Sequence, residues 1–223
     1  MKDGYHHWSF HNLLVWLLSY ILISPILATL PGAGILVGLL MSAILFSAVY
    51  VINRQGRMFT GTIILMVITL TLFWGDYFTL FSFSRPVSSV LLCLYLGLLS
   101  FSIGRMLFSA RKITSALISG ALCLYLIFGM FWGSVYYFLE LLQPGSFAGA
   151  LISNPEKYSN LLHYFQYFSF VTLTTLGYGD ILPQTEIATA FCQVEAIIGQ
   201  FFMAVLVARF VGIHIAQEFS ADS

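Results

Sequence analysis

Long apolar runs, separated by short polar breaks, make up most of this chain. A helix needs about 20 apolar residues to cross the hydrocarbon core of a bilayer. Six runs come close to this length, and they cover residues 12–30, 33–52, 58–80, 87–109, 113–140 and 184–212. The pattern predicts six transmembrane helices.

The connection between the last two runs has two parts. Residues 141–159 are polar and rich in turn-forming residues, so we expect an exposed outer loop there. Ser159 or Asn160 can then cap a short helix that ends near Leu173. Because this helix is too short to span a bilayer, we expect it to enter the membrane and stop, with the chain returning as extended backbone. Such backbone is tolerated at membrane depth only inside protein or along a water-filled path.

Composition places the chain in the class of all-α integral membrane proteins. Of its 223 residues 59% are hydrophobic and 8% are charged, against about 25% charged in a soluble domain. Nine basic and nine acidic residues cancel, so we expect the lipid bilayer and no nucleic acid as a partner. The first run lacks a convincing cleavage site and is expected to remain as a helix. Cys93, Cys123 and Cys192 lie in apolar runs, without disulfide or metal spacing.

Basic residues predict the orientation. Arg54 and Arg57 lie between the second and third runs, and Arg111 and Lys112 lie between the fourth and fifth. Since lysine and arginine favour the cytoplasmic side, both termini are predicted to be cytoplasmic. Residues 141–183 are then predicted to face outward.

Residues Thr174 to Asp180 read TTLGYGD. Glycine adopts positive φ without a Cβ clash, so a G-x-G stretch can turn successive carbonyls the same way. In potassium channels, four loops of the T-V-G-Y-G type replace the ion's hydration shell with carbonyl oxygens. The chain resembles the tetrameric potassium channel family at these residues. Six of the seven positions fit the family pattern, and Leu176 replaces the more common valine.

The resemblance implies roles for individual residues. Thr175 would offer its hydroxyl and carbonyl to K⁺, and Leu176, Gly177 and Tyr178 would offer carbonyls. The residues implied to support this filter are Thr174, Gly179, Asp180 and Tyr167. Tyr178 is expected to pack against the short helix, the Leu176 side chain to pack behind the filter, and Tyr167 to donate a hydrogen bond to Asp180.

The resemblance also implies an assembly and a function. One filter loop cannot enclose an ion, and the chain holds one copy of the motif, so a homotetramer is expected. Its function would be passive, potassium-selective conduction across the plasma membrane, without enzymatic activity. K⁺ would be the only ligand, with no organic cofactor.

The last run carries the candidate gate. Gly199 lies 20 residues after Gly179, where family members often have a hinge glycine. A hinge and close packing remain equally open for Gly199, and helical spacing adds Met203 and Val207 to its stripe. Glu195 is an ionisable residue within a transmembrane run, which predicts contact with protein or water. A hydrogen bond to the short helix and a proton-sensing role both remain open for it.

The last run also has predicted ends. Thr185 is the expected N-cap of its helix, and Arg209 is expected to extend to the cytoplasmic interface.

The six runs group into two predicted domains, residues 1–112 and 113–223. The fourth run has Arg105 and a basic end rather than the repeated arginines of a voltage sensor, so steep voltage gating is not expected. His6, His7 and His11 form a polar N-terminal group, which could also bind a metal or respond to pH.

Two other functions fit part of the sequence. A tetrameric cation channel with weak selectivity would share the architecture, but such relatives usually depart from Gly-Tyr-Gly. An intramembrane aspartyl protease of the G-x-G-D type could use Asp180 and Asp76. The short re-entrant segment and the absence of a Pro-Ala-Leu element argue against that enzyme.

Overall fold

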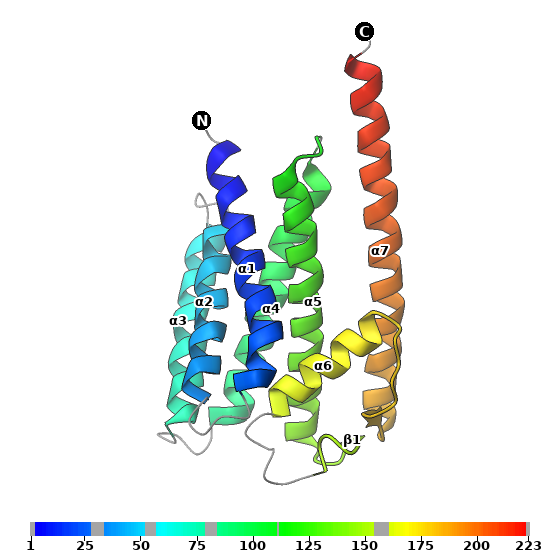
Figure 1. The fold of residues 1–223 in the computed structure, drawn as a ribbon. Coiled ribbons are helices and arrows are strands. Elements are labelled where there is room, and N and C mark those ends of the chain that lie inside the picture. Colours follow the sequence, from blue (N-terminus) through cyan, green and yellow to red (C-terminus); the bar gives the residue numbers. More distant parts are fainter. Residues whose placement is uncertain are drawn as a thin grey trace. The chain divides into compact units, whose positions relative to one another are not determined.

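The computed structural model describes residues 3–27, 34–51, 57–78, 84–110, 112–153 and 161–221, which are almost entirely helical (Figure 1). The elements in chain order are α1 (Asp3–Leu27), α2 (Gly34–Val51), α3 (Arg57–Tyr77), α4 (Ser84–Ser109), α5 (Ser115–Leu142), β1 (Phe147–Ala148), α6 (Leu161–Leu173), β2 (Leu182–Pro183) and α7 (Glu186–Ala221). The all-helical class is therefore confirmed for this part of the chain.

Each predicted apolar run lies largely within one helix, but two helices extend well beyond their runs. α1 starts at Asp3 rather than near residue 12, and α7 continues to Ala221 rather than ending near residue 212. Apolar character marks only the part of a helix suited to the bilayer core. The helix itself continues through polar residues because each backbone N–H still finds a carbonyl one turn earlier.

Five of the described helices are long and apolar enough to cross a membrane. Their spanning parts are Phe10–Leu27, Gly34–Val51, Arg85–Ser109, Ser115–Leu142 and Glu186–Glu218. The apolar part of α3, Phe59–Gly75, is shorter. The protein is therefore suited to a membrane, and the count of six spans stays a prediction.

The chain forms two compact units, and α5 contributes to both. The first unit contains residues 1–109 and 114–128, and the second contains residues 110–113 and 129–223. In the first unit α1 packs against α2, and α3 packs against α4. Its core includes the fully buried Leu13, Ile44 and Tyr95. The Tyr95 hydroxyl donates to the Leu45 carbonyl at 2.5 Å and so links α4 to α2.

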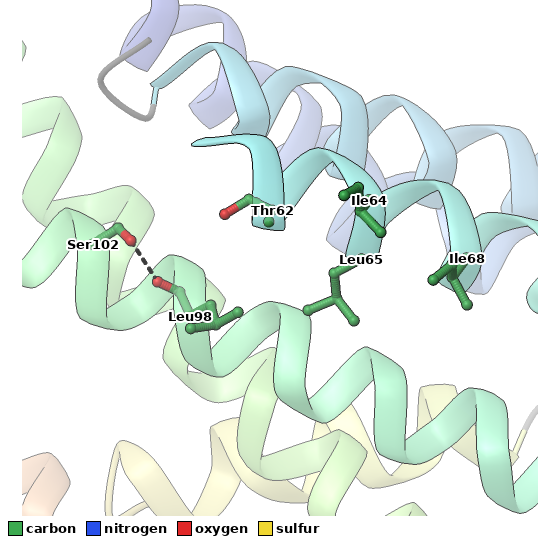
Figure 2. A pocket seen from close by; sticks show the side chains of 7 residues that line it. Thr62, Ile64, Leu65, Ile68, Leu98 and Ser102 are labelled. Atoms are coloured by element: carbon green, nitrogen blue, oxygen red, sulfur yellow. Dashed lines mark hydrogen bonds between the residues drawn. The ribbon is translucent and has the colours of Figure 1, made fainter. Parts of the chain in front are cut away.

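An open groove of about 390 Å³ lies between α3 and α4 in the first unit (Figure 2). Its walls are mostly apolar and include Ile64, Leu65, Ile68 and Leu98. The Ser102 hydroxyl in this groove donates to the Leu98 carbonyl of its own helix at 2.7 Å. Charged side chains do not line the groove, so it offers no group for acid–base or ion chemistry.

The second unit contains a short helix after which the chain turns back. α6 has 13 residues, and Figure 1 shows the extended segment after it turning back toward the start of α7. α6 packs against α7, and β2 follows the extended segment. A short helix followed by a returning extended segment is the arrangement that the sequence predicts between the last two apolar runs. The predicted caps Ser159 and Asn160 lie outside the described residues.

Candidate functional site: the loop after α6

Two glycines of α5 let α6 approach it closely. A Cβ atom on Gly133 would lie 2.5 Å from the Cα of Gln166, and one on Gly129 would lie 2.3 Å from the ring of Phe170. Contacts this short exclude a side chain, so α6 lies directly against the α5 backbone. Beside this contact the rings of Tyr136 and Phe168 pack with centroids 5.2 Å apart. α6 is therefore held firmly where its C-terminal end begins the loop.

The loop N–H groups return to the end of α6. The Val171 carbonyl accepts from Leu176 N at 3.0 Å and from Gly177 N at 3.3 Å, and the Thr172 carbonyl accepts from Thr175 N at 3.0 Å. In a trans peptide the carbonyl of one residue points opposite to the N–H of the next. The carbonyls of Thr174, Thr175 and Leu176 therefore point away from α6. A row of backbone oxygens results, directed to the open side of the loop.

Positive φ angles alternate along the same loop. Thr175 has φ 59°, Gly177 has φ 60° and Gly179 has φ 76°. A residue with positive φ at every second position rotates the peptide planes so that successive carbonyls can face the same side of the loop. Thr175 is the only non-glycine with positive φ among the described residues. For a β-branched residue this is a strained conformation, of the kind that clusters at functional sites. The motif alone did not indicate this strain.

The loop is open in the single chain. Residues 174–179 are all exposed, with Leu176 at 55% and Tyr178 at 66%. The expected packing of Tyr178 against the short helix, and of Leu176 behind the filter, is therefore not achieved within one chain. Both side chains need a neighbouring surface to be buried. The Thr175 hydroxyl donates to the Thr174 carbonyl at 2.6 Å and keeps its own lone pairs available.

Asp180 is held behind the loop. The Tyr167 hydroxyl donates to its Oδ2 at 2.6 Å, and Ile181 N donates to its Oδ1 at 3.1 Å. The hydrogen bond expected between Tyr167 and Asp180 is thus present. Partial burial and this bond to the carboxylate raise the pKa of Tyr167 to about 12. The Asp76 side chain, invoked for the protease alternative, lies outside the described residues.

A second carboxylate, not predicted from the sequence, orders the outer loop. The Glu140 carboxylate accepts from Gly145 N at 2.8 Å and from Phe147 N at 3.0 Å. It thereby positions β1, which pairs with β2 in an antiparallel ribbon through Ala148 and Leu182. The segment after the TTLGYGD motif is therefore fixed to the loop after α5.

The start of α7 follows its prediction. Ala188 N donates to the Thr185 hydroxyl at 3.3 Å, so Thr185 is the N-cap. Further along, Gly199 is buried, and a Cβ there would lie 2.6 Å from Leu173 Cδ1 and 3.2 Å from the Leu173 carbonyl oxygen. Close packing therefore accounts for this glycine. Met203 and Val207 are both exposed in the single chain.

Glu195 is fully buried and joins three helices. It accepts hydrogen bonds from the Tyr136 hydroxyl of α5 and from the Ser169 hydroxyl of α6. The contact with α6 is one of the two alternatives left open by the sequence. Tyr136 and Ser169 were not predicted as its partners, because they lie 59 and 26 residues away in the chain.

The later part of α7 contacts the segment before α5. Arg209 Nη2 donates to the Ala110 carbonyl at 3.0 Å, and Ile113 N donates to Gln217 Oε1 at 3.3 Å. Arg209 therefore binds this connecting segment, and its extension to the cytoplasmic interface stays a prediction.

The five long apolar helices are suited to a membrane-embedded protein. Residues 114–214 match a family model described as an ion channel. This part of the chain is thus similar to an ion-channel domain, and it contains α6, the TTLGYGD loop and most of α7. No curated protein matches the chain. The family match favours ion transport over enzymatic activity.

Proposed function

We propose that the chain forms a potassium-selective channel in which four copies place their TTLGYGD loops around one axis. The observation that carries the proposal is the backbone of residues 174–179. Its first N–H groups bind the end of α6, the carbonyls of Thr174, Thr175 and Leu176 point to the open side, and positive φ angles alternate along it. Rings of such carbonyl oxygens can replace the hydration shell of K⁺.

Exposure of the loop supports an assembly of several copies. Extended backbone at membrane depth must be surrounded by protein or line a water-filled path, because lipid offers no hydrogen-bond partner. The exposed Thr175 and Gly177 meet neither condition in one chain. A ring of four copies meets both, since each loop then faces a water-filled axis and contacts its neighbours.

Each part of the loop then has a role. Thr175 supplies a hydroxyl and a carbonyl to K⁺, while Leu176, Gly177 and Tyr178 supply carbonyls. Tyr167 and Asp180 hold the back of the filter through their hydrogen bond. Met203 and Val207 line the cavity toward the gate. No organic cofactor is needed, because the ion moves down its electrochemical gradient.

We further propose the cellular setting. Residues 1–112 form an N-terminal membrane domain without an arginine array, and residues 113–223 form the pore domain. Both termini are cytoplasmic, because the basic residues gather in the loops on that side. The channel lies in the plasma membrane and does not respond steeply to voltage.

A flux assay tests this function. Purified protein is placed in liposomes loaded with K⁺, and release into a K⁺-free medium is measured with Na⁺-loaded liposomes in parallel. We expect rapid K⁺ release and little Na⁺ release. Equal release of both ions would favour a weakly selective cation channel, and no release of either ion would contradict the channel.

A further inference from the structure

The buried group that the filter does not use is the Glu195 carboxyl. Glu195, Tyr136 and Ser169 each have an exposed fraction of 0%. The carboxyl makes its two hydrogen bonds with hydroxyl groups, those of Tyr136 and Ser169. No basic side chain of the described region pairs with it. Burial of an ionised carboxylate without a cation is so unfavourable that such a group usually takes up a proton instead.

The number of hydrogens in this cluster gives an independent indication of its protonation state. Ser169 Oγ lies within hydrogen-bonding distance of Glu195 Oε1 and, at 2.8 Å, of the Gly129 carbonyl. Tyr136 makes the third contact, to Glu195 Oε2. A hydroxyl has one hydrogen to donate, so the two hydroxyls can fill only two of these three contacts.

A proton on Glu195 supplies the missing hydrogen. The acid then donates to Ser169 Oγ, Ser169 donates to the Gly129 carbonyl, and Tyr136 donates to the second oxygen of Glu195. A carbonyl within a helix can accept this extra bond because it has two lone pairs. The titratable groups facing Glu195 are the Tyr136 hydroxyl of α5 and the Cys192 thiol of α7, and α6 contributes the hydroxyl of Ser169.

We propose that Glu195 is a positioning residue for conduction: as a neutral carboxylic acid, it fixes α6 to α5 and α7 at Ser169. Ser169 lies one helical turn before Leu173, where α6 ends and the carbonyl row begins. The position of that turn sets where the row of loop oxygens lies. This inference rests on the proposed channel function, which the wild-type protein tests separately.

Substitutions at Glu195 separate the neutral acid from an ionised one. In Glu195→Gln the amide N–H can replace the acid O–H toward Ser169, and the amide oxygen can still accept from Tyr136. Glu195→Ala removes both bonds. We expect Glu195→Gln to keep the K⁺ over Na⁺ permeability ratio of the wild type. Glu195→Ala and Ser169→Ala should lower it by about tenfold, which corresponds to about 1.4 kcal/mol between the two ions.

Two matched controls are available in the same unit. Glu186→Gln makes the same change at an exposed position in the first turn of α7. Ser134→Ala removes a buried hydroxyl that donates only to the Met130 carbonyl of its own helix. Both controls should retain the wild-type ratio. Loss of selectivity in Ser134→Ala comparable to that in Ser169→Ala would contradict a specific role for the cluster.

An infrared measurement decides the protonation state without relying on conduction. The difference spectrum between wild type and Glu195→Gln at neutral pH should contain the carbonyl stretch of a protonated carboxylic acid. The symmetric and antisymmetric bands of a carboxylate in its place would overturn the proposal, and so would a Glu195→Gln channel as impaired as Glu195→Ala. If Glu195→Ala does not assemble, the infrared spectrum and the Glu195→Gln channel still decide. A wild type that conducts no K⁺ would contradict the proposed function. The infrared spectrum would still decide the protonation state of Glu195.

Discussion

Thr175 adopts the conformation that a threonine normally avoids, with φ 59°. Strain of this kind costs of order 1–3 kcal/mol and persists only where the surroundings enforce it. Here the hydrogen bonds from Thr175 N to Thr172 and from Leu176 N to Val171 enforce it. The strain is the local consequence of pointing successive carbonyls to one side.

Gly177 offers a direct test of this backbone. Its φ is 60°, and a Cβ atom would meet nothing within 4 Å in the single chain. Gly177→Ala therefore acts mainly through the backbone, where a left-handed L-residue costs about 1–2 kcal/mol. We expect loss of K⁺ conduction in a protein that still folds, measured by flux and by thermal unfolding.

Gly145 provides the matched control. It has φ 89°, also has nothing within 4 Å, and lies in the outer loop away from the filter motif. Gly145→Ala should lose similar stability and still conduct K⁺. Wild-type conduction in Gly177→Ala would contradict the assignment of the filter.

The Tyr167 hydroxyl gives a prediction that includes pH. Because its pKa is raised from 10.0 to about 12, the phenol stays protonated and donates to Asp180 at neutral pH. The stability from this bond is complete below pH 10 and falls as the pH rises toward 12. We expect Tyr167→Phe to lower the free energy of unfolding at neutral pH by about 1 kcal/mol.

Thermal unfolding at neutral pH checks this value, and Tyr164→Phe, three residues earlier on α6, is the control. Titration of tyrosine absorbance should show one phenol ionising near pH 12 in the wild type and missing from Tyr167→Phe. Loss of a phenol that ionises near pH 10 instead would contradict the hydrogen bond.

At this scale the sequence predicted contacts that belong to a motif and missed those that join distant helices. The pair Tyr167 and Asp180 follows from the motif and its preceding helix. The partners of Glu195 do not, since periodicity within one helix does not say which residue of another helix it meets. Glu140 was missed for a similar reason, because its partners are backbone N–H groups of the following loop.

The helices themselves were the easiest feature to predict. Apolar runs gave their approximate positions, and α6 ends at Leu173 as predicted. Their ends were less accurate where polar residues continue a helix, as at the start of α1 and the end of α7. Close approach between helices was not predictable from glycine content alone, since Gly133 and Gly61 look alike in sequence. Of these two glycines, Gly133 would meet the backbone of Gln166 within 4 Å, whereas Gly61 would meet nothing.

Gly199 and Leu173 test whether α7 needs its glycine for packing. A Cβ at Gly199 would lie 2.6 Å from Leu173 Cδ1. Gly199→Ala should lower stability by about 1–3 kcal/mol through overpacking. Since Leu173→Val removes the Cδ atoms, the double variant should recover part of this loss in thermal unfolding.

The control for this pair is Gly212→Ala on the same helix, where nothing lies within 4 Å, and it should change stability little. If conduction fails in Gly199→Ala and the double variant restores neither stability nor conduction, bending at Gly199 explains the glycine better than packing.

At the scale of the whole molecule, the single chain leaves α7 mostly uncovered. α7 is the least buried of the five helices suited to span a membrane, and the loop beside it exposes polar backbone. Lipid can cover the apolar side chains of α7 but cannot satisfy that backbone. Neighbouring copies can cover both, which favours the same assembly as the single copy of the motif, since one loop cannot enclose an ion.

The assembly has a measurable size. We expect four copies in detergent or nanodiscs, each of 24.9 kDa, by native mass spectrometry or light scattering. Tyr178, which is 66% exposed in one chain, should become protected from solvent in the assembly, as measured by chemical labelling of tyrosines. A stable monomer or dimer that conducts K⁺ would contradict the four-loop filter.

In the proposed channel the loop oxygens select K⁺ over Na⁺. The reversal potential in a planar bilayer, under a tenfold K⁺ gradient balanced by Na⁺, tests it most directly. A K⁺-selective pore should give a value near the potassium equilibrium potential, about 59 mV in magnitude for a tenfold gradient of a monovalent ion, and this current should be lost in Gly177→Ala. A reversal potential near zero with large currents, or no current from wild-type protein, would contradict it.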